Sequence, residues 1–191
     1  MMEEIRSFIA VEIPEVLRQK LREFLRELKT TGADVKWVRP EGIHLTLKFL
    51  GAVRQDVLEK ITLSIRPVAE RFFPFEMRAE GCGCFPSLRN PRVVWAGLTD
   101  REGAVLRLQS EIEAAAAELG FPPEDRPFKP HLTLGRVRSP KGKIPLAQKI
   151  EGNARLDLGS FPVDRVILFR SDLRPEGAVY TQLREFCLKG I

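Results

Sequence analysis

Hydrophobic residues alternate with polar ones, or form short apolar runs, along nine segments of this chain, and along three others they recur at helical spacing. Alternation places the two classes on opposite faces of a strand, whereas a spacing of three to four positions marks one face of a helix. The pattern predicts strands at 6–11, 35–38, 43–51, 75–81, 92–97, 131–134, 154–158, 163–169 and 179–188. It predicts helices at 14–28, 56–65 and 103–119.

Glycine and proline mark the ends of several of these elements. Gly32 and Gly120 follow two of the predicted helices as stop signals, and Pro67 is expected to kink or end the helix at 56–65. The segment CGCFPSLRNP at 82–91 is expected to be a loop at the edge of a groove. The order of elements predicts an α+β protein with helices packed outside antiparallel sheets.

The tetrapeptide His-Leu-Thr-Leu occurs twice, at 44–47 and at 131–134, and these copies contain the only 2 histidines of the 191 residues. In a strand, residues i and i+2 share a face and lie roughly 6.5 to 7 Å apart. Each copy can therefore direct one imidazole and one hydroxyl at a common point. Two lobes related by an approximate two-fold axis are expected, each contributing one such strand to the groove between them.

Two imidazoles and two hydroxyls facing each other across a groove suit a small anion, and phosphate is the natural candidate. A neutral histidine can accept a proton from water while a charged one donates a proton to a leaving oxygen. The threonine hydroxyls would hold the non-bridging oxygens. The arrangement therefore suits hydrolysis of a phosphodiester.

Simpler interpretations exist for each part of this pattern. A single histidine on a strand is usually a hydrogen-bonded structural residue, and threonine favours strands in any case. A two-histidine metal site is the chief chemical alternative, but catalytic zinc generally has three protein ligands. Neither histidine belongs to a His-x-His or His-Glu-x-x-His pattern or has a flanking carboxylate. We expect chemistry that needs no metal and no cofactor.

Composition indicates an ordinary globular protein, with 43% hydrophobic and 30% charged residues. No apolar run approaches the ~18 residues of a membrane span, and residues 1–4 do not resemble the start of a signal peptide. The 3 cysteines, Cys82, Cys84 and Cys187, form no disulfide framework or metal knuckle and are expected to be reduced. We expect a cytoplasmic monomer with no membrane partner.

The net charge of +5 is unevenly distributed. Between Asp125 and Glu151 there is no carboxylate, and the second His-Leu-Thr-Leu lies within this stretch. Its cations are Arg126, Lys129, Arg136, Arg138, Lys141, Lys143 and Lys149. A solvated, lysine-rich loop is one interpretation. A polyanionic partner is the other, and release of counterions would then favour an oligonucleotide over a free nucleotide.

The segments HLTLKFLG, GCFPSLRNPRVVWAG and PHLTLGR closely resemble the two-histidine (2H) phosphoesterases, in particular the RNA 2′,3′-cyclic phosphodiesterases, also called 2′-5′ RNA ligase-like proteins. The resemblance runs from RSFIAVEIP to the final strands. It implies a bilobal α+β fold, with two antiparallel sheets and outer helices related by a pseudo-two-fold around a central cleft, in one catalytic domain of residues 1–191. It also implies metal-independent opening of a 2′,3′-cyclic phosphate at an RNA or nucleotide end, leaving a 2′-phosphomonoester.

The same resemblance implies a role for each motif residue. His44 and His131 are the catalytic pair, and Thr46 and Thr133 bind the phosphate. We assign His44 as proton donor to the 3′ oxygen and His131 as proton acceptor from water. The near-symmetry of the motifs leaves the reverse assignment open.

Each motif ends five residues after its histidine in a residue suited to stacking, Phe49 in the first and Arg136 in the second. Strict alternation turns both away from the histidine face, but a bulge would return them. As a hypothesis they sandwich the terminal base, with a core position as the alternative for Phe49. Phe85 and Arg89 are weaker candidates for the cleft wall, and Lys48 for electrostatic attraction of the substrate.

Three other functions remain open from the sequence. The first is an RNA ligase that joins a 2′,3′-cyclic end to a 5′ hydroxyl through a 2′-5′ link, which is the reverse reaction with an alcohol in place of water. The second is a noncatalytic module that binds RNA ends. The third is a phosphodiesterase acting on a small metabolite such as ADP-ribose 1″,2″-cyclic phosphate.

Overall fold

Two antiparallel sheets form the body of the protein in the computed structural model, which describes residues 4–175 and 177–191. Sheet A has the strand order β3 (His44–Arg54), β1 (Glu4–Glu12), β8 (Arg165–Arg174), β9 (Gly177–Cys187). Sheet B has the order β2 (Val35–Trp37), β6 (His131–Val137), β5 (Asn90–Thr99), β4 (Phe75–Ser87), β7 (Asp157–Val163). The expectation about a signal peptide concerns mainly residues 1–3, which lie outside the described residues.

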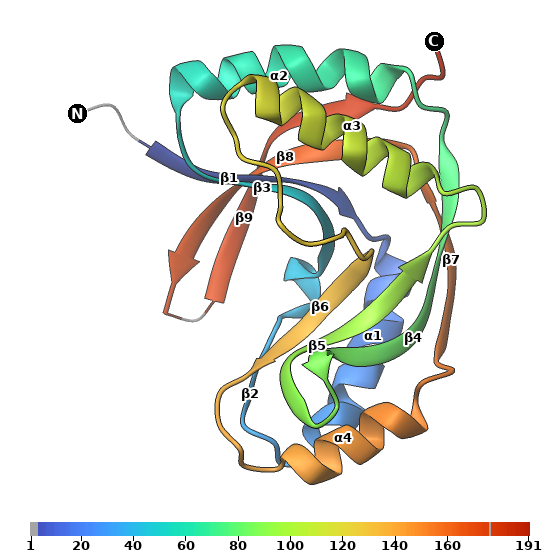
Figure 1. Cartoon of the computed structure of the whole chain (residues 1–191). Helices are drawn as coiled ribbons and strands as arrows, with labels where there is room; N and C mark the ends of the chain where they lie inside the picture. The colour runs from blue at the N-terminus through green and yellow to red at the C-terminus, as the bar shows by residue number, and fades with distance from the viewer. Residues whose placement is uncertain (1–3, 176) are drawn as a thin grey trace.

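Four α-helices of the described residues lie on the outer faces of the two sheets (Figure 1). Sheet A is covered by α2 (Gln55–Glu70) and α3 (Ala104–Glu118), and sheet B by α1 (Glu15–Lys29) and α4 (Lys143–Gly152). The predicted α+β architecture of two antiparallel sheets with outer helices is confirmed. No helix among the described residues has the length and apolar content needed to cross a membrane.

The apolar stripe predicted for the first helix is the buried face of α1. Leu17, Leu21, Phe24, Leu25 and Leu28 are all buried against sheet B. Each such side chain contributes roughly 1.5 to 3 kcal/mol when it is removed from water. The polar face of the helix stays in solvent, so α1 packs with a defined orientation.

The chain passes repeatedly from one sheet to the other. β1 lies in sheet A, α1 and β2 belong to the side of sheet B, and β3 returns to sheet A. β4 to β7 then build most of sheet B, while α3 covers sheet A on the way, and β8 and β9 complete sheet A. Each lobe is therefore assembled from both halves of the chain (Figure 1).

The expectation that Pro67 kinks or ends its helix is wrong as to the end, because α2 continues to Glu70, and a kink at Pro67 stays a prediction. Proline removes only the hydrogen bond to the carbonyl four residues earlier, that of Leu63. Leu63 is 72% exposed, so water can satisfy that carbonyl. Val68 and Ala69 are buried and hold the last turn against the core.

The prediction of a loop at 82–91 is also wrong, because β4 runs to Ser87 and β5 begins at Asn90. Only Leu88 and Arg89 form the turn between them. Gly83 in this segment allows the side chain of Trp95 to pack closely against the backbone of β4. A Cβ atom added to Gly83 would lie 2.4 Å from Cζ2 of Trp95, so only glycine lets the indole cross β4 there.

The helix α4 was not predicted. Leu146 and Ile150 are its only buried apolar side chains, so the sequence carries little helical periodicity there. The bounds of several strands also differ from the prediction, most clearly in the last third of the chain. The strand expected at 154–158 is β7, which starts at Asp157 and ends at Val163, and β8 starts only at Arg165.

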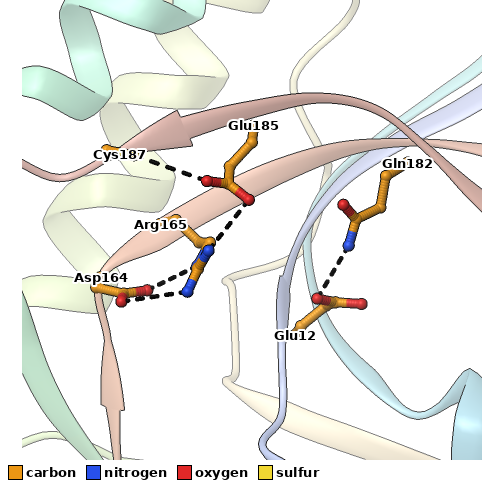
Figure 2. A network of polar contacts seen from close by, with 6 residues as sticks. All are labelled: Glu12, Asp164, Arg165, Gln182, Glu185 and Cys187. Atoms are coloured by element: carbon orange, nitrogen blue, oxygen red, sulfur yellow. Dashed lines mark hydrogen bonds and ion pairs between the residues drawn. The ribbon is translucent and has the colours of Figure 1, made fainter.

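A long hairpin of β8 and β9 forms the edge of sheet A. At its base, Nε of Arg165 lies 2.9 Å from Oδ1 of Asp164 and its Nη1 lies 3.2 Å from Oε2 of Glu185 (Figure 2). Further along, Nε2 of Gln182 donates to Oε2 of Glu12 at 3.1 Å (Figure 2). These groups are exposed and each pair contributes about 0 to 1 kcal/mol. In the register of this hairpin Arg165 lies opposite Cys187, beside Glu185. Farther along the hairpin Ser171 lies opposite Tyr180.

Candidate functional site

The strands that begin with the two histidines face each other across a cleft of about 300 Å³ between the sheets. β3 is an edge strand of sheet A, and β6 lies in sheet B. From the two motifs, the cleft is lined by His44, Thr46, Phe49, His131, Thr133 and Arg136. The structure therefore brings together all six residues that the sequence singled out as catalytic or substrate-binding.

A β-bulge in β3 explains how Phe49 reaches the cleft. Thr46 pairs with Ala10 and Lys48 with Ile9, so Leu47 is an extra residue on its strand. The extra residue shifts the alternation by one position. As a result Phe49 lies on the histidine face, while Lys48 lies on the opposite, buried face.

The same bulge occurs at the same place in the second motif. Thr133 pairs with Trp95 and Gly135 with Val94, so Leu134 is the extra residue of β6. Arg136 is thereby returned to the histidine face, as Phe49 is in β3. The expectation that a bulge brings both residues back is confirmed, and the alternative of a core position for Phe49 is wrong.

Lys48 does not line the cleft, so its expected role in attracting substrate is wrong. Its side chain is 2% exposed, and its Nζ lies 2.7 Å from Oε2 of Glu113 in α3. The same nitrogen donates to the backbone carbonyl of Pro122 at 2.7 Å. The bulge is the reason, since it moves this residue from the polar to the buried face.

The two weaker candidates for the cleft wall have different positions. Phe85 sits beside the second histidine, with its ring edge-on to that of His131 and 5.1 Å between centroids. Arg89 lies in the β4–β5 turn and is not among the residues that line the cleft. Because β4 and β5 continue past the predicted loop, their turn lies beyond the site.

His44 is enclosed by aromatic side chains of sheet A. Its ring stacks on Phe8 at a centroid distance of 4.6 Å, and Tyr180 lies edge-on at 5.1 Å. Nδ1 lies 2.9 Å from the carbonyl oxygen of Gly42. A carbonyl only accepts, so Nδ1 carries the proton and Nε2 has the free lone pair in the neutral ring. Burial lowers the pKa of His44 to about 4, against the opposing effect of the Gly42 hydrogen bond.

His131 is held in the same way on the opposite sheet. Its Nδ1 lies 2.7 Å from the carbonyl oxygen of Lys129. Lys129 is two residues before His131, just as Gly42 is two residues before His44. The matching hydrogen bonds fix the same tautomer in both rings. Phe85 is the aromatic neighbour of His131 among the described residues, so His131 is less enclosed than His44.

Three further polar side chains that sequence reasoning missed also line the cleft. They are Arg6 of β1, Ser171 of β8 and Tyr180 of β9. The guanidinium carbon of Arg6 lies 4.4 Å from the ring centroid of Phe49. Burial raises the pKa of Tyr180, and the charges of Arg6 and Arg136 oppose that rise. Both guanidinium groups therefore lie near the phenol.

Little in the sequence pointed to these three residues. Arg6 opens an otherwise apolar strand, and its alternation with Phe8 is the one signal that could have placed it on the cleft face. Ser171 and Tyr180 reach the cleft only because β8 pairs with β1, far away in the chain, and β9 pairs with β8.

Comparison with known proteins places this site in a family. A model described as LigT-like phosphoesterase matches residues 11–95 and residues 98–180, so each matched segment contains one His-Leu-Thr-Leu. The chain belongs to the LigT-like phosphoesterase family. The resemblance found in the sequence is thereby confirmed.

Relatives of this LigT-like phosphoesterase match along nearly its whole length. It is 38% identical over 185 residues to the RNA 2′,3′-cyclic phosphodiesterase of Methanothermobacter thermautotrophicus, covering 97% of this chain and 100% of the relative. It is 36% identical over 182 residues to the protein of that name from Archaeoglobus fulgidus, covering 95% and 99%.

Solved structures of the family have the same fold. The crystal structure of the protein TT0787 of Thermus thermophilus matches with a TM-score of 0.81 and 34% identity, over 97% of this chain and 98% of that one. Escherichia coli LigT complexed with 3′-AMP matches with a TM-score of 0.79 and 25% identity, over 97% and 99%.

The polar groups of this LigT-like phosphoesterase that converge on the cleft are imidazoles, hydroxyls and guanidinium groups. Among residues 4–175 and 177–191, no three His, Cys, Asp or Glu side chains form a group that could hold a metal ion. Two imidazoles with free Nε2 atoms can exchange protons, and the hydroxyls and guanidinium groups can donate to an anion. These groups together suit acid–base chemistry on a phosphate ester.

Proposed function

We propose that this protein is a catalytic domain, formed by residues 1–191, that hydrolyses 2′,3′-cyclic phosphates at RNA or nucleotide ends to 2′-phosphomonoesters without a metal ion. The observation that carries the proposal is the pair of imidazoles, each fixed by a backbone carbonyl, that enter one cleft from two sheets. The names of the relatives support the choice of substrate. The protein acts in the cytoplasm as a monomer, and light scattering after size-exclusion chromatography tests the monomeric state.

His131 accepts a proton from a water molecule, whose oxygen then attacks phosphorus. The bond from phosphorus to the 3′ oxygen breaks, and His44 donates a proton to that oxygen. Thr46 and Thr133 donate hydrogen bonds to the non-bridging oxygens, on which negative charge increases in the transition state. Each proton transfer contributes about 10²- to 10⁴-fold to the rate.

In this mechanism His44 acquires its proton together with the substrate. With a pKa of about 4, the imidazole is neutral near pH 7 when the cleft is empty. A phosphate anion beside the ring raises its pKa, because a nearby negative charge favours the imidazolium. The low pKa of free His44 equally favours the reverse assignment, in which His44 is the base, so the two roles need a direct test.

Phe49 and Arg136 hold the terminal base between a ring and a guanidinium plane. They enter the cleft from opposite sheets at equivalent positions of their strands. Arg6 lies against Phe49 and can support the ring from one side. Stacking on such side chains tolerates any base, because every base has a π-face.

The first experiment uses 2′,3′-cyclic AMP and a short RNA with a cyclic end, in the presence of chelator. We expect wild-type protein to form the 2′-phosphate, and His44→Ala and His131→Ala to lose about 10²-fold or more of the activity. Turnover that survives both substitutions, or binding without turnover, would refute the mechanism and leave an RNA-end binding module. A 2′-5′ linked product with an added 5′-hydroxyl RNA would identify a ligase.

A second experiment assigns the roles of the histidines. In a cyclic substrate with sulfur in place of the 3′ bridging oxygen, the leaving thiolate needs no proton. We expect this substrate to restore much of the activity of His44→Ala and little of that of His131→Ala. Restoration of His131→Ala instead would exchange the two roles while leaving the proposed reaction intact.

A further inference from the structure

The geometry of a 2′,3′-cyclic nucleotide determines where the rest of an RNA chain must lie. The phosphate bridges the 2′ and 3′ oxygens on one edge of the ribose, and the base and the 5′ carbon project from the opposite edge. With the phosphate at the histidines and the base between Phe49 and Arg136, the 5′ carbon points the same way as the base. Because β6 begins at His131 and ends next to Arg136, that direction is toward the end of β6. This step rests on the proposed function.

The end of sheet B that lies in this direction is rich in positive charge. We call it the basic end and define it by Lys36, Arg89, Arg138, Lys141 and Lys143. All of these side chains are exposed or half-buried. They come from β2, the β4–β5 turn, the segment after β6 and the start of α4, which meet in the lower left of Figure 1.

Backbone contacts bring these segments together. Lys36 pairs with Arg136 across β2 and β6, so the basic end begins beside the cleft. The N–H of Arg138 donates to the carbonyl of Asp34 at 2.8 Å, and the N–H of Asp34 donates to the carbonyl of Lys141 at 3.1 Å. Lys143 reaches Asn90, next to Arg89, with 3.4 Å between Nζ and Oδ1.

The cations of the basic end are not neutralised by neighbouring carboxylates, unlike Arg54 and Arg170 of sheet A. Asp34 is the carboxylate among these segments, and no ion pair is formed by the side chains of the basic end with the described residues. On sheet A, by contrast, Arg54 pairs with Asp56 at 2.9 Å and Arg170 with Asp172 at 2.8 Å. The side chains of the basic end therefore keep their positive charge beside the cleft.

We propose that the basic end binds the phosphates of the RNA chain on the 5′ side of the cyclic phosphate. Oligonucleotides with a cyclic end are then better substrates than free cyclic nucleotides. Phosphate contacts release counterions, so each one steepens the dependence of log affinity on log salt by about 0.7 for a single strand. The free nucleotide, which cannot reach the basic end, lacks this part of the salt dependence.

The test compares 2′,3′-cyclic AMP with oligoadenylates of increasing length that carry a 2′,3′-cyclic end. The variant is Lys36→Gln, Arg138→Gln and Lys141→Gln together. The matched control is Lys60→Gln, Arg66→Gln and Arg101→Gln, which removes the same charge from exposed residues of α2 and of the loop after the far end of β5. kcat/KM is measured for each substrate at several salt concentrations.

We expect kcat/KM of the wild type to rise with chain length and to fall steeply with salt for the oligonucleotides. In the triple variant, kcat/KM for the oligonucleotides should fall by about 10-fold or more and the salt slope by up to about 2, while 2′,3′-cyclic AMP is hydrolysed as before. Equal effects of the variant and the control, or no dependence on length, would overturn the proposal. Failure of wild type to hydrolyse 2′,3′-cyclic AMP would instead count against the proposed function.

Discussion

At the scale of single residues, the two histidines have the same backbone contact and different surroundings. Gly42 and Lys129 hold the Nδ1 atoms through equivalent carbonyls. Aromatic rings then enclose His44, so burial lowers its pKa. The same sequence, His-Leu-Thr-Leu, therefore places two imidazoles in different surroundings, and burial among aromatic rings acts on that of His44.

The low pKa of His44 should make folding stability depend on pH. The pKa is about 4 in the folded protein and about 6.5 in an unfolded chain, so the unfolded state binds more protons between these values. The contribution of His44 to the free energy of unfolding is fully present above about pH 6.5. It falls by about 2 to 3 kcal/mol as the pH drops to about 4. Urea unfolding of wild type and His44→Gln at both ends of this range measures it. Equal pH dependence in the two proteins would contradict the assignment.

Arg136 is predicted to affect binding of the substrate more than the chemical step. Loss of its stacking and charge should raise KM for 2′,3′-cyclic AMP by about 5-fold or more, since base stacking contributes about 1 to 3 kcal/mol. Steady-state kinetics of Arg136→Ala checks this, with Arg136→Lys as the control that keeps the charge without the plane. An unchanged KM in Arg136→Ala would exclude the proposed contact.

At the scale of elements, a buried polar cluster supports the bulge of β3. Lys48 binds Glu113 and the carbonyl of Pro122, while Nε2 of Gln109 lies 3.3 Å from the carbonyl oxygen of Leu47, the extra residue of the bulge. The cluster ties β3 to α3 and to the segment that leads to β6. It therefore helps to hold the strand conformation that turns Phe49 into the cleft.

Removing one partner of this cluster should cost more than removing both. Lys48→Met leaves the carboxylate of Glu113, whose side chain is 14% exposed, without its cation, so we expect the free energy of unfolding to fall by about 3 kcal/mol. In the double variant Lys48→Met, Glu113→Gln, much of this loss should be recovered. Urea denaturation of the single and double variants measures the coupling. Additive effects of the two substitutions would show that the ion pair is not the source of the loss.

The hairpin of β4 and β5 depends on the absence of a side chain at Gly83. An added Cβ would meet Cζ2 of Trp95 at 2.4 Å, and Trp95 in turn packs beside Phe85, the neighbour of His131. Gly83→Ala is predicted to destabilise the fold by about 1 to 3 kcal/mol through overpacking. Thermal unfolding measures the effect, and Gly152→Ala, where an added Cβ has no neighbour within 4 Å, is the control. A wild-type midpoint for Gly83→Ala would contradict the packing argument.

At the scale of the whole molecule, the lobes are interleaved, because β1 and β3 of sheet A are separated in the chain by α1 and β2 on sheet B. Neither sheet can form from one continuous half. We therefore expect a single cooperative unfolding transition. Both tryptophans, Trp37 and Trp95, lie in sheet B, so their fluorescence reports on that lobe while far-UV circular dichroism reports on both. Two transitions that do not coincide would show that the lobes unfold separately.

The sequence by itself determined the local features of this protein. Alternation identified the two strands that begin with the histidines, and helical spacing identified α1 and α3. The repeat of His-Leu-Thr-Leu identified the paired imidazoles and hydroxyls. All of these patterns extend over only a few residues, so they can be read from the sequence alone. It also placed Phe49 and Arg136 correctly, since the repeat suggested equivalent positions and a bulge.

Only the tertiary structure decided which other residues meet the histidines. Arg6, Ser171 and Tyr180 join the cleft through strand pairings between distant segments, and Lys48 is outside it because the bulge turns its side chain toward Glu113 of α3. The same holds for the pKa of His44, which depends on rings from β1, β8 and β9. The sequence of a strand determines which of its faces is polar. Which residues contact that face depends on how the whole chain packs.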